Sequence, residues 1–183
     1  MKKSIKLIFL ISILFVFSMA LGCENKEDNL SIVKGNNYDK VIEQGFQSEG
    51  LSLQDILYEK TIGESKMIFF TSDEALGLAY MGKDEDGWTY NRITTLTNFE
   101  SDKTPPSYMA AGLEVKTPDG IKFFLAMGKI FNPNITKITL SNDSINTIIK
   151  EKDGNIFWFQ LLDNKNLFQN IKAYDKDDKQ LNY

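Results

Sequence analysis

The sequence predicts a mainly β protein, an antiparallel sandwich or barrel of about ten short strands. From Asp55 onward, short runs rich in β-branched and aromatic residues alternate with turns of Gly, Pro, Asn and Asp. Two runs, Ile156–Leu162 and Ile121–Met127, are apolar at nearly every position instead of at alternate positions. Strands of that kind are covered on both faces, so we expect two central strands between packed layers.

A short helix is predicted before the strands, over Tyr38–Gln47, because Val41, Ile42 and Phe46 share one face at helical spacing. Gly45 weakens this pattern, since glycine lowers helix propensity. Residues 38–183 are expected to form a single β-rich domain. Its predicted strands are Ile56–Ile62, Lys66–Thr71, Leu76–Met81, Trp88–Leu96, Tyr108–Lys116, Ile121–Ile130, Ile135–Leu140, Ile145–Lys150, Ile156–Leu162 and Gln169–Tyr174.

The strongest turn signal is Pro118-Asp119-Gly120, which lies between two of the predicted strands. Proline presets one turn dihedral, and glycine accepts a positive φ without steric cost. The sequence therefore predicts a β-hairpin at this point.

The N-terminus has the pattern of a secretory signal. Three lysines precede an apolar run from Leu7 to Leu21. As a helix this run is about 22 Å long, which is short of the roughly 30 Å hydrocarbon core of a bilayer. Acidic residues follow it, where a stop-transfer segment would carry Lys or Arg. Export is therefore favoured over a permanent membrane span.

The end of that run, Met19-Ala20-Leu21-Gly22-Cys23, resembles a bacterial lipobox. The resemblance implies cleavage between Gly22 and Cys23 and attachment of a diacylglyceryl group to Cys23, the only cysteine in the chain. Ala20 departs from the usual leucine. Residues 1–22 are then a lipoprotein signal peptide and residues 23–37 a lipidated flexible tether. The alternative is an ordinary secreted protein with a chance cysteine.

Composition narrows the function. The chain has no histidine, so it lacks the commonest general base and metal ligand. Removal of residues 1–22 takes three of the 21 basic residues and none of the 25 acidic ones, so the mature net charge is about −7. This balance disfavours nucleic-acid binding. The lysine-rich composition is similar to that of Gram-positive lipoproteins, which implies a cell-membrane location on the extracytoplasmic face.

Few residues mark a chemical site. The acidic runs Asp84-Glu85-Asp86-Gly87 and Asp175-Lys176-Asp177-Asp178 do not match a calcium-binding EF-hand loop, and solvated turns are favoured; whether either binds calcium stays open. Trp158 is expected in the core, whereas Trp88 follows an acidic turn and is the candidate exposed binding aromatic. No catalytic, cofactor-binding or metal-ligating residue is predicted.

The leading functional hypothesis is a non-enzymatic, lipid-anchored binding or envelope-accessory domain, held at the membrane by its diacylglyceryl anchor and recognising an envelope protein. The second is a β-barrel carrier of a small apolar ligand. The third is a hydrolase that uses carboxylates alone, since 25 acidic residues can supply a pair by chance.

Overall fold

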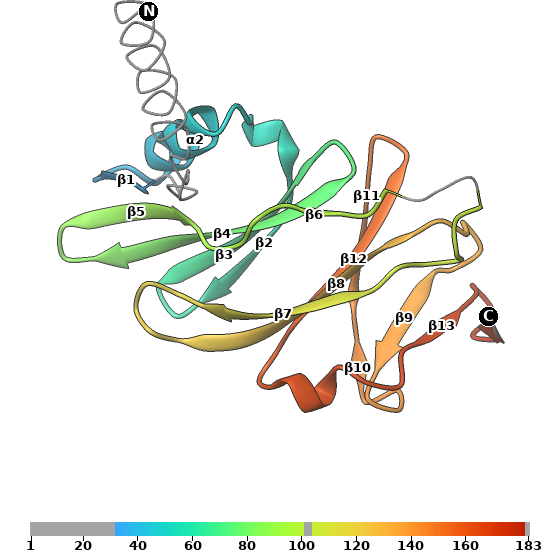
Figure 1. Cartoon of the computed structure of the whole chain (residues 1–183). Helices are drawn as coiled ribbons and strands as arrows, with labels where there is room; N and C mark the ends of the chain where they lie inside the picture. The colour runs from blue at the N-terminus through green and yellow to red at the C-terminus, as the bar shows by residue number, and fades with distance from the viewer. Residues whose placement is uncertain (1–31, 101–103, 182–183) are drawn as a thin grey trace, which may run out of the picture.

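The protein is a stack of one helix and three antiparallel sheets (Figure 1). The structure is a computed structural model and describes residues 32–100 and 104–181. The mainly β, antiparallel prediction is confirmed. Within residues 32–100 and 104–181 each sheet is open and does not close on itself, so the sandwich forms and the barrel alternative does not.

The first sheet has the strand order β1-β5-β4-β3-β2, and β6 pairs with the far end of β4. Its strands are β1 (Ile32–Gly35), β2 (Ile56–Ile62), β3 (Ser65–Ser72), β4 (Ala75–Asp84), β5 (Gly87–Arg92) and β6 (Thr97–Asn98).

The second sheet, in the order β11-β12-β8-β7, lies between the first sheet and a smaller third sheet in the order β10-β9-β13-β14. Its strands are β7 (Ala111–Lys116), β8 (Lys122–Ile130), β11 (Ile148–Lys152) and β12 (Asn155–Leu162). The third sheet consists of β9 (Lys137–Leu140), β10 (Ile145–Asn146), β13 (Lys172–Tyr174) and β14 (Gln180–Leu181). The short 3-10 turn η1 (Leu53–Asp55) leads from the helix into β2, and η2 (Lys165–Leu167) lies between β12 and β13.

Helix α2 (Tyr38–Ser48) covers the outer face of the first sheet and confirms the helix prediction to within one residue. The Asn37 side chain caps it by accepting a hydrogen bond from the Lys40 amide. Gly45 is present because the helix lies directly on Tyr90, whose ring would be 2.4 Å from any added Cβ. The glycine that weakened the helical pattern is therefore a packing requirement.

The main core lies between the first two sheets, where Phe69 of β3 stacks on Phe159 of β12 with ring centroids 4.0 Å apart. The two strands predicted to be central, β8 and β12, are neighbours in the middle sheet and bury side chains on both faces. Trp158 is fully buried, as predicted, and donates its indole N–H to the Met109 carbonyl at 3.1 Å.

Several sequence-based boundaries are wrong. The predicted strand Ile145–Lys150 is divided between β10 and β11, because Thr147 donates both its amide and its hydroxyl to the Ile138 carbonyl and stops the run. The run Trp88–Leu96 ends at Arg92, where the amides of Ile93 and Thr94 turn to the Leu78 carbonyl.

The flexible tether predicted over residues 23–37 is wrong at its C-terminal end. Residues 32–35 form β1, which pairs with β5, and Asn37 caps α2. Residues 23–31 of that segment, Cys23 among them, lie outside the described residues, as does the signal peptide at residues 1–22. The strand was missed because Ile32 and Val33 form too short an apolar run to indicate pairing.

Candidate functional site

The β7–β8 hairpin carries the candidate site, and the predicted turn joins its two strands. Thr117 accepts a hydrogen bond from the Gly120 amide and donates its own amide to the Ile121 carbonyl, both at 2.9 Å. Gly120 has φ of +90°, as a three-residue hairpin loop with a glycine bulge requires. The hairpin prediction from Pro118-Asp119-Gly120 is therefore confirmed.

A hydroxyl on the first sheet holds the tip of this hairpin in place. Tyr80 of β4 donates its hydroxyl to the Asp119 carboxylate at 2.8 Å. The Tyr80 hydroxyl oxygen also lies 2.8 Å from Ser65 Oγ. Burial alone would raise the pKa of Asp119, but hydrogen bonds from Thr117 and Tyr80 outweigh it and hold the pKa below its usual value. Asp119 is thus a structural carboxylate that ties two sheets together.

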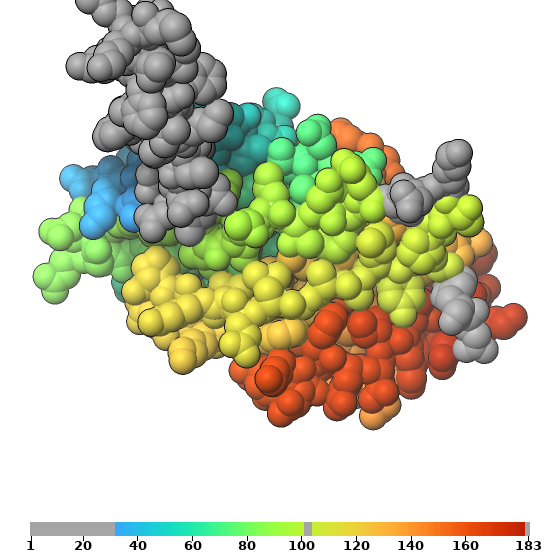
Figure 2. Space-filling view, in the orientation of Figure 1, coloured from blue at the N-terminus to red at the C-terminus, as the bar shows by residue number. Residues whose placement is uncertain are grey.

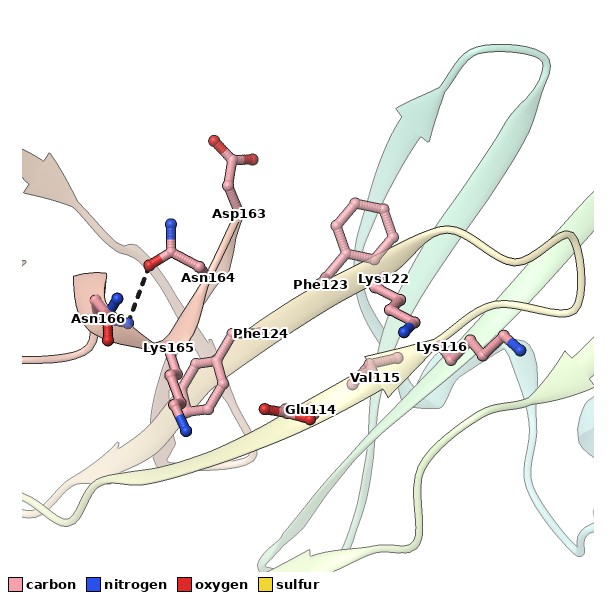
Figure 3. Close-up of a pocket in the computed structure, with 10 residues that line it drawn as sticks. All are labelled: Glu114, Val115, Lys116, Lys122, Phe123, Phe124, Asp163, Asn164, Lys165 and Asn166. Atoms are coloured by element: carbon pink, nitrogen blue, oxygen red, sulfur yellow. Dashed lines mark hydrogen bonds between the residues drawn. The ribbon is translucent and has the colours of Figure 1, made fainter.

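On the outer face of the hairpin lies a groove of about 630 Å³. Figure 3 shows the Phe124 and Phe123 rings on opposite sides of β8, with Phe123 directed toward the first sheet. The segment that contains η2 forms the opposite wall (Figure 3). The lining residues are Glu114, Val115, Lys116, Lys122, Phe123, Phe124, Asp163, Asn164, Lys165 and Asn166.

Three lysines give the groove its electrostatic character. Lys116 and Lys122 are directly opposite each other across β7 and β8, and Lys165 lies on the facing wall. Because Thr117 and Ile121 form a hydrogen-bonded pair, Lys116 and Lys122 form a non-hydrogen-bonded pair, in which side chains are closest. Neither lysine makes an ion pair within the described part of the chain. Two like charges in this arrangement destabilise a hairpin, and an anion between them would relieve the repulsion.

An aromatic floor adjoins these lysines. The Phe124 ring lies 5.4 Å from the Phe168 ring, centroid to centroid, and Gly112 leaves room for both, since an added Cβ would lie 2.5 Å from Phe124. The groove therefore offers positive charge beside apolar surface, and it can bind a group that is both anionic and partly apolar.

A second hollow, of about 390 Å³, lies on the other side of the hairpin tip. It separates Pro118 and Asp119 from the inward face of β1, β5 and β4. On that face the exposed side chains of Ile32 and Lys34 lie beside the half-buried Thr89 and Asn91.

A charge cluster on the third sheet has its members paired, in contrast to the lysines of the groove. Asp143 accepts hydrogen bonds from Lys172, Tyr174 and Thr139, and these contacts, Lys172 foremost, hold its pKa well below the usual range. They anchor a turn in which three consecutive residues, Ser141 to Asp143, have positive φ. Stabilisation of this strained turn therefore explains the cluster.

A buried acid also has a structural role. Glu49, whose side chain is 6% exposed, accepts a hydrogen bond from the Tyr90 hydroxyl at 3.0 Å and pairs with Arg92 at 3.1 Å. Burial raises the pKa of Tyr90, and the adjacent Glu49 carboxylate raises it further. This contact joins the end of α2 to β5.

Trp88, the predicted binding aromatic, lies away from the groove. It is half-buried on the helix side of the first sheet, with its ring 4.9 Å from that of Tyr38 and Lys83 Nζ 5.7 Å from its centroid. Packing against α2, which the sequence did not reveal, accounts for its partial burial.

The acidic turns have backbone roles. Asp84 accepts a hydrogen bond from the Asp86 amide, and Asp175 accepts bonds from the amides of Asp177 and Lys179. Among the described residues, no group of three or more Cys, Asp or Glu side chains is arranged to hold a metal ion.

Sequence reasoning missed Lys116, Lys122, Lys165 and Phe124 as site residues. One signal was present: a three-residue loop closed by Thr117 and Ile121 places Lys116 opposite Lys122. The sequence gives no comparable signal that, among the described residues, the third sheet does not extend over this part of the hairpin.

No family model, curated protein or solved structure matches this chain. Within residues 32–100 and 104–181, no helix has the length and apolar character needed to cross a membrane.

Proposed function

We propose that this chain is a membrane-anchored lipoprotein with a non-enzymatic binding domain, and that its ligand is an anionic group held in the groove of the β7–β8 hairpin. The proposal rests on Lys116 and Lys122, which lie directly opposite each other beside the Phe124 ring. Within the described residues neither lysine makes an ion pair. Such a pair of lysines lowers the stability of the free protein, and an anionic ligand would compensate for that cost.

The anchoring half of the proposal rests on the lipobox resemblance at Cys23. Described structure begins at Ile32, nine residues further on, so the intervening chain spans at most about 30 Å. Two acyl chains would hold the domain firmly, on the extracytoplasmic face and close to the membrane. A ligand of this domain would therefore be a component of the cell envelope.

Anchoring is tested by labelling with radioactive palmitate in cells that express the full chain. Wild type is expected to incorporate the label and to sediment with membranes, whereas Cys23→Ser is expected to do neither. If Cys23→Ser still sediments with membranes and wild type remains unlabelled, the lipoprotein assignment is wrong.

Ligand binding is tested by immobilising the full chain in detergent and capturing components of an envelope extract. The double variant Lys116→Glu/Lys122→Glu is expected to lose at least tenfold of any component that the groove binds. Lys150→Glu/Lys179→Glu carries the same charge change away from the groove and should capture as wild type does. Equal capture by both double variants would remove the groove as the binding site.

The carrier and hydrolase hypotheses make different predictions. A carrier would show a thermal shift with fatty acids that Lys116→Glu/Lys122→Glu does not reduce. A hydrolase would lose turnover of a glycan substrate on Glu114→Gln, since Glu114 and Asp163 are the carboxylates of the groove. Either result would replace the non-enzymatic binding proposal.

A further inference from the structure

The first and second sheets share one edge and differ at the other. At the shared edge, β2 lies beside β11: Lys152 donates to the Gln54 carbonyl, and Lys150 Nζ is 5.5 Å from the Tyr58 ring centroid. Counted from there, the first sheet runs β2, β3, β4, β5, β1 and the second runs β11, β12, β8, β7. The fifth strand, β1, therefore extends past the second sheet, and no strand of the described residues faces it.

The inward face of β1 shows this lack of cover. Ile32 is 65% exposed although it lies on the side of the sheet that faces the main core. With Lys34 it lines the 390 Å³ hollow beside Pro118. In a sandwich, such a position is normally covered by a strand of the opposite sheet.

The edge of β7 that borders this space has free backbone groups. Since Thr117 pairs with Ile121 by hydrogen bonds, the odd-numbered residues of β7 bond to β8 and the even-numbered ones point outward. The outward residues are Gly112, Glu114 and Lys116, and all three are exposed. Within the described chain, β7 pairs with β8 alone.

We propose that the partner is an extended peptide segment of another protein, which adds to β7 as a fifth strand of the second sheet and covers the inward face of β1. This inference rests on the proposed function and names the class of ligand. Strand addition satisfies the backbone groups of Gly112, Glu114 and Lys116 and buries Ile32.

The two hollows set the side-chain pattern of the added strand. Its residue opposite Lys116 faces the groove, where Lys116, Lys122 and Lys165 favour a carboxylate. Its residue opposite Glu114 faces the same side, and the like charge of Glu114 favours an uncharged polar residue there. Its alternate residues, opposite Leu113 and Val115, face Ile32 and are apolar. The geometry thus selects a strand in which polar and apolar residues alternate, with a carboxylate at the position opposite Lys116.

A second copy of this chain fits the edge less well than a single strand. In a two-fold pairing of β7 with β7, the overhanging β1 of one copy would occupy the place of β5 in the other, because the first sheet is one strand wider than the second. The space beside β7 therefore accommodates a strand without a covering sheet of its own.

The probe is the octapeptide Glu-Val-Thr-Val-Glu-Val-Thr-Val, blocked at both ends and labelled with a fluorophore, so that a threonine can lie opposite Glu114 when a glutamate lies opposite Lys116. Its anisotropy is measured with the full chain in detergent. Two N-methylated versions are matched controls. In an antiparallel pairing, N-methylation of the glutamates and threonines removes the N–H groups that would face β7 and should abolish binding, whereas N-methylation of the valines should be tolerated.

Three variants locate the peptide. Glu114→Pro removes an outward N–H without breaking a β7–β8 hydrogen bond and should weaken binding at least tenfold, while Glu114→Gln should weaken it less than threefold. Ile32→Asp, on the other sheet, should weaken binding several-fold.

Equal binding of the two N-methylated peptides, or equal affinity of Glu114→Pro and Glu114→Gln, would overturn strand addition. The peptide controls keep the test decisive if Glu114→Pro does not fold. If an anionic glycan such as a hyaluronate oligosaccharide binds wild type but not Lys116→Glu/Lys122→Glu, while the peptide does not bind, strand addition is overturned and the proposed groove function stands. If Lys116→Glu/Lys122→Glu captures components of the envelope extract as well as wild type does, the proposed function itself fails.

Discussion

Two hairpins of this protein, β3–β4 and β7–β8, differ in how much of each is covered. Helix α2 lies on one face of β3–β4 and the second sheet on the other, so Met67 to Phe70 are all buried. The β7–β8 hairpin is covered on both faces only in its half away from the tip, where Leu125 to Ile130 of β8 are all buried, and toward its tip the groove replaces the third sheet. Figure 2 shows the β7–β8 region, in yellow, exposed along the front of the molecule.

The comparison separates stability from recognition. Residues of β3–β4 gain their free energy from burial within the molecule. The tip of β7–β8 keeps unpaired charge and free backbone groups, which add nothing to stability and are available to a partner. Binding surfaces are expected on the second kind of hairpin.

The largest expected effect is truncation of a ring covered on both sides. Phe69→Ala in β3 removes the ring stacked on Phe159 and should cost about 3–5 kcal/mol of unfolding free energy. Phe124→Ala, in the partly covered β8, should cost about 1–2 kcal/mol, since its ring is half-buried. Urea denaturation measures both. Equal costs would show that the two hairpins are equally stabilised by packing.

The cover over β3–β4 is itself tied down by Glu49. Glu49→Ala leaves Arg92 without its carboxylate partner and should cost about 2–3 kcal/mol, below the range for fully buried pairs because the Arg92 side chain is 19% exposed. Glu49→Gln keeps an acceptor for Tyr90 and should cost less. A loss within measurement error for Glu49→Ala would mean that α2 is held by its apolar face alone.

Tyr80 joins the two hairpins, so removing its hydroxyl tests whether they are coupled. Tyr80→Phe should cost about 1 kcal/mol, and hydrogen exchange should accelerate at the tip of β7–β8 more than within β3–β4. Uniform acceleration across both hairpins would contradict a local link.

The same link predicts a pH dependence. Because the folded-state pKa of Asp119 lies below the usual carboxyl value of 3.8, its contribution is complete above that value and is lost as pH falls through the depressed pKa. Asp119→Asn should therefore be less stable than wild type at pH 7, and the difference should close below pH 3.8. Thermal melts at both pH values measure this, and a constant difference would be evidence against it.

The smallest effect has the opposite sign. Lys116→Thr removes one of two opposed lysines and should raise the stability of the free protein by about 0.2–1 kcal/mol, while it weakens binding in the groove. Lys179→Thr, an exposed lysine outside the hairpin, should change neither. A stability loss in Lys116→Thr would show that repulsion between the two lysines does not destabilise the free protein.

Local sequence patterns predicted individual strands and turns, but not which of their faces other elements cover. The turn at Pro118-Asp119-Gly120 and the doubly apolar strand Ile156–Leu162 were readable because their signals lie within a few residues of each other. Strand β1 and the division at Thr147 were not, since each depends on a partner strand distant in sequence.

The sequence by itself determined the mainly β class, the helix that became α2, the central strands and the hairpin that carries the candidate site. Its lipobox pattern also predicts the anchor at Cys23. Only the tertiary structure decided that α2 half-buries Trp88, that β1 extends past the second sheet, and that Lys116 and Lys122 face an open groove. The physical reason is that turns and strand periodicity are local properties of the chain, whereas cover depends on which sheets stack and where each one ends.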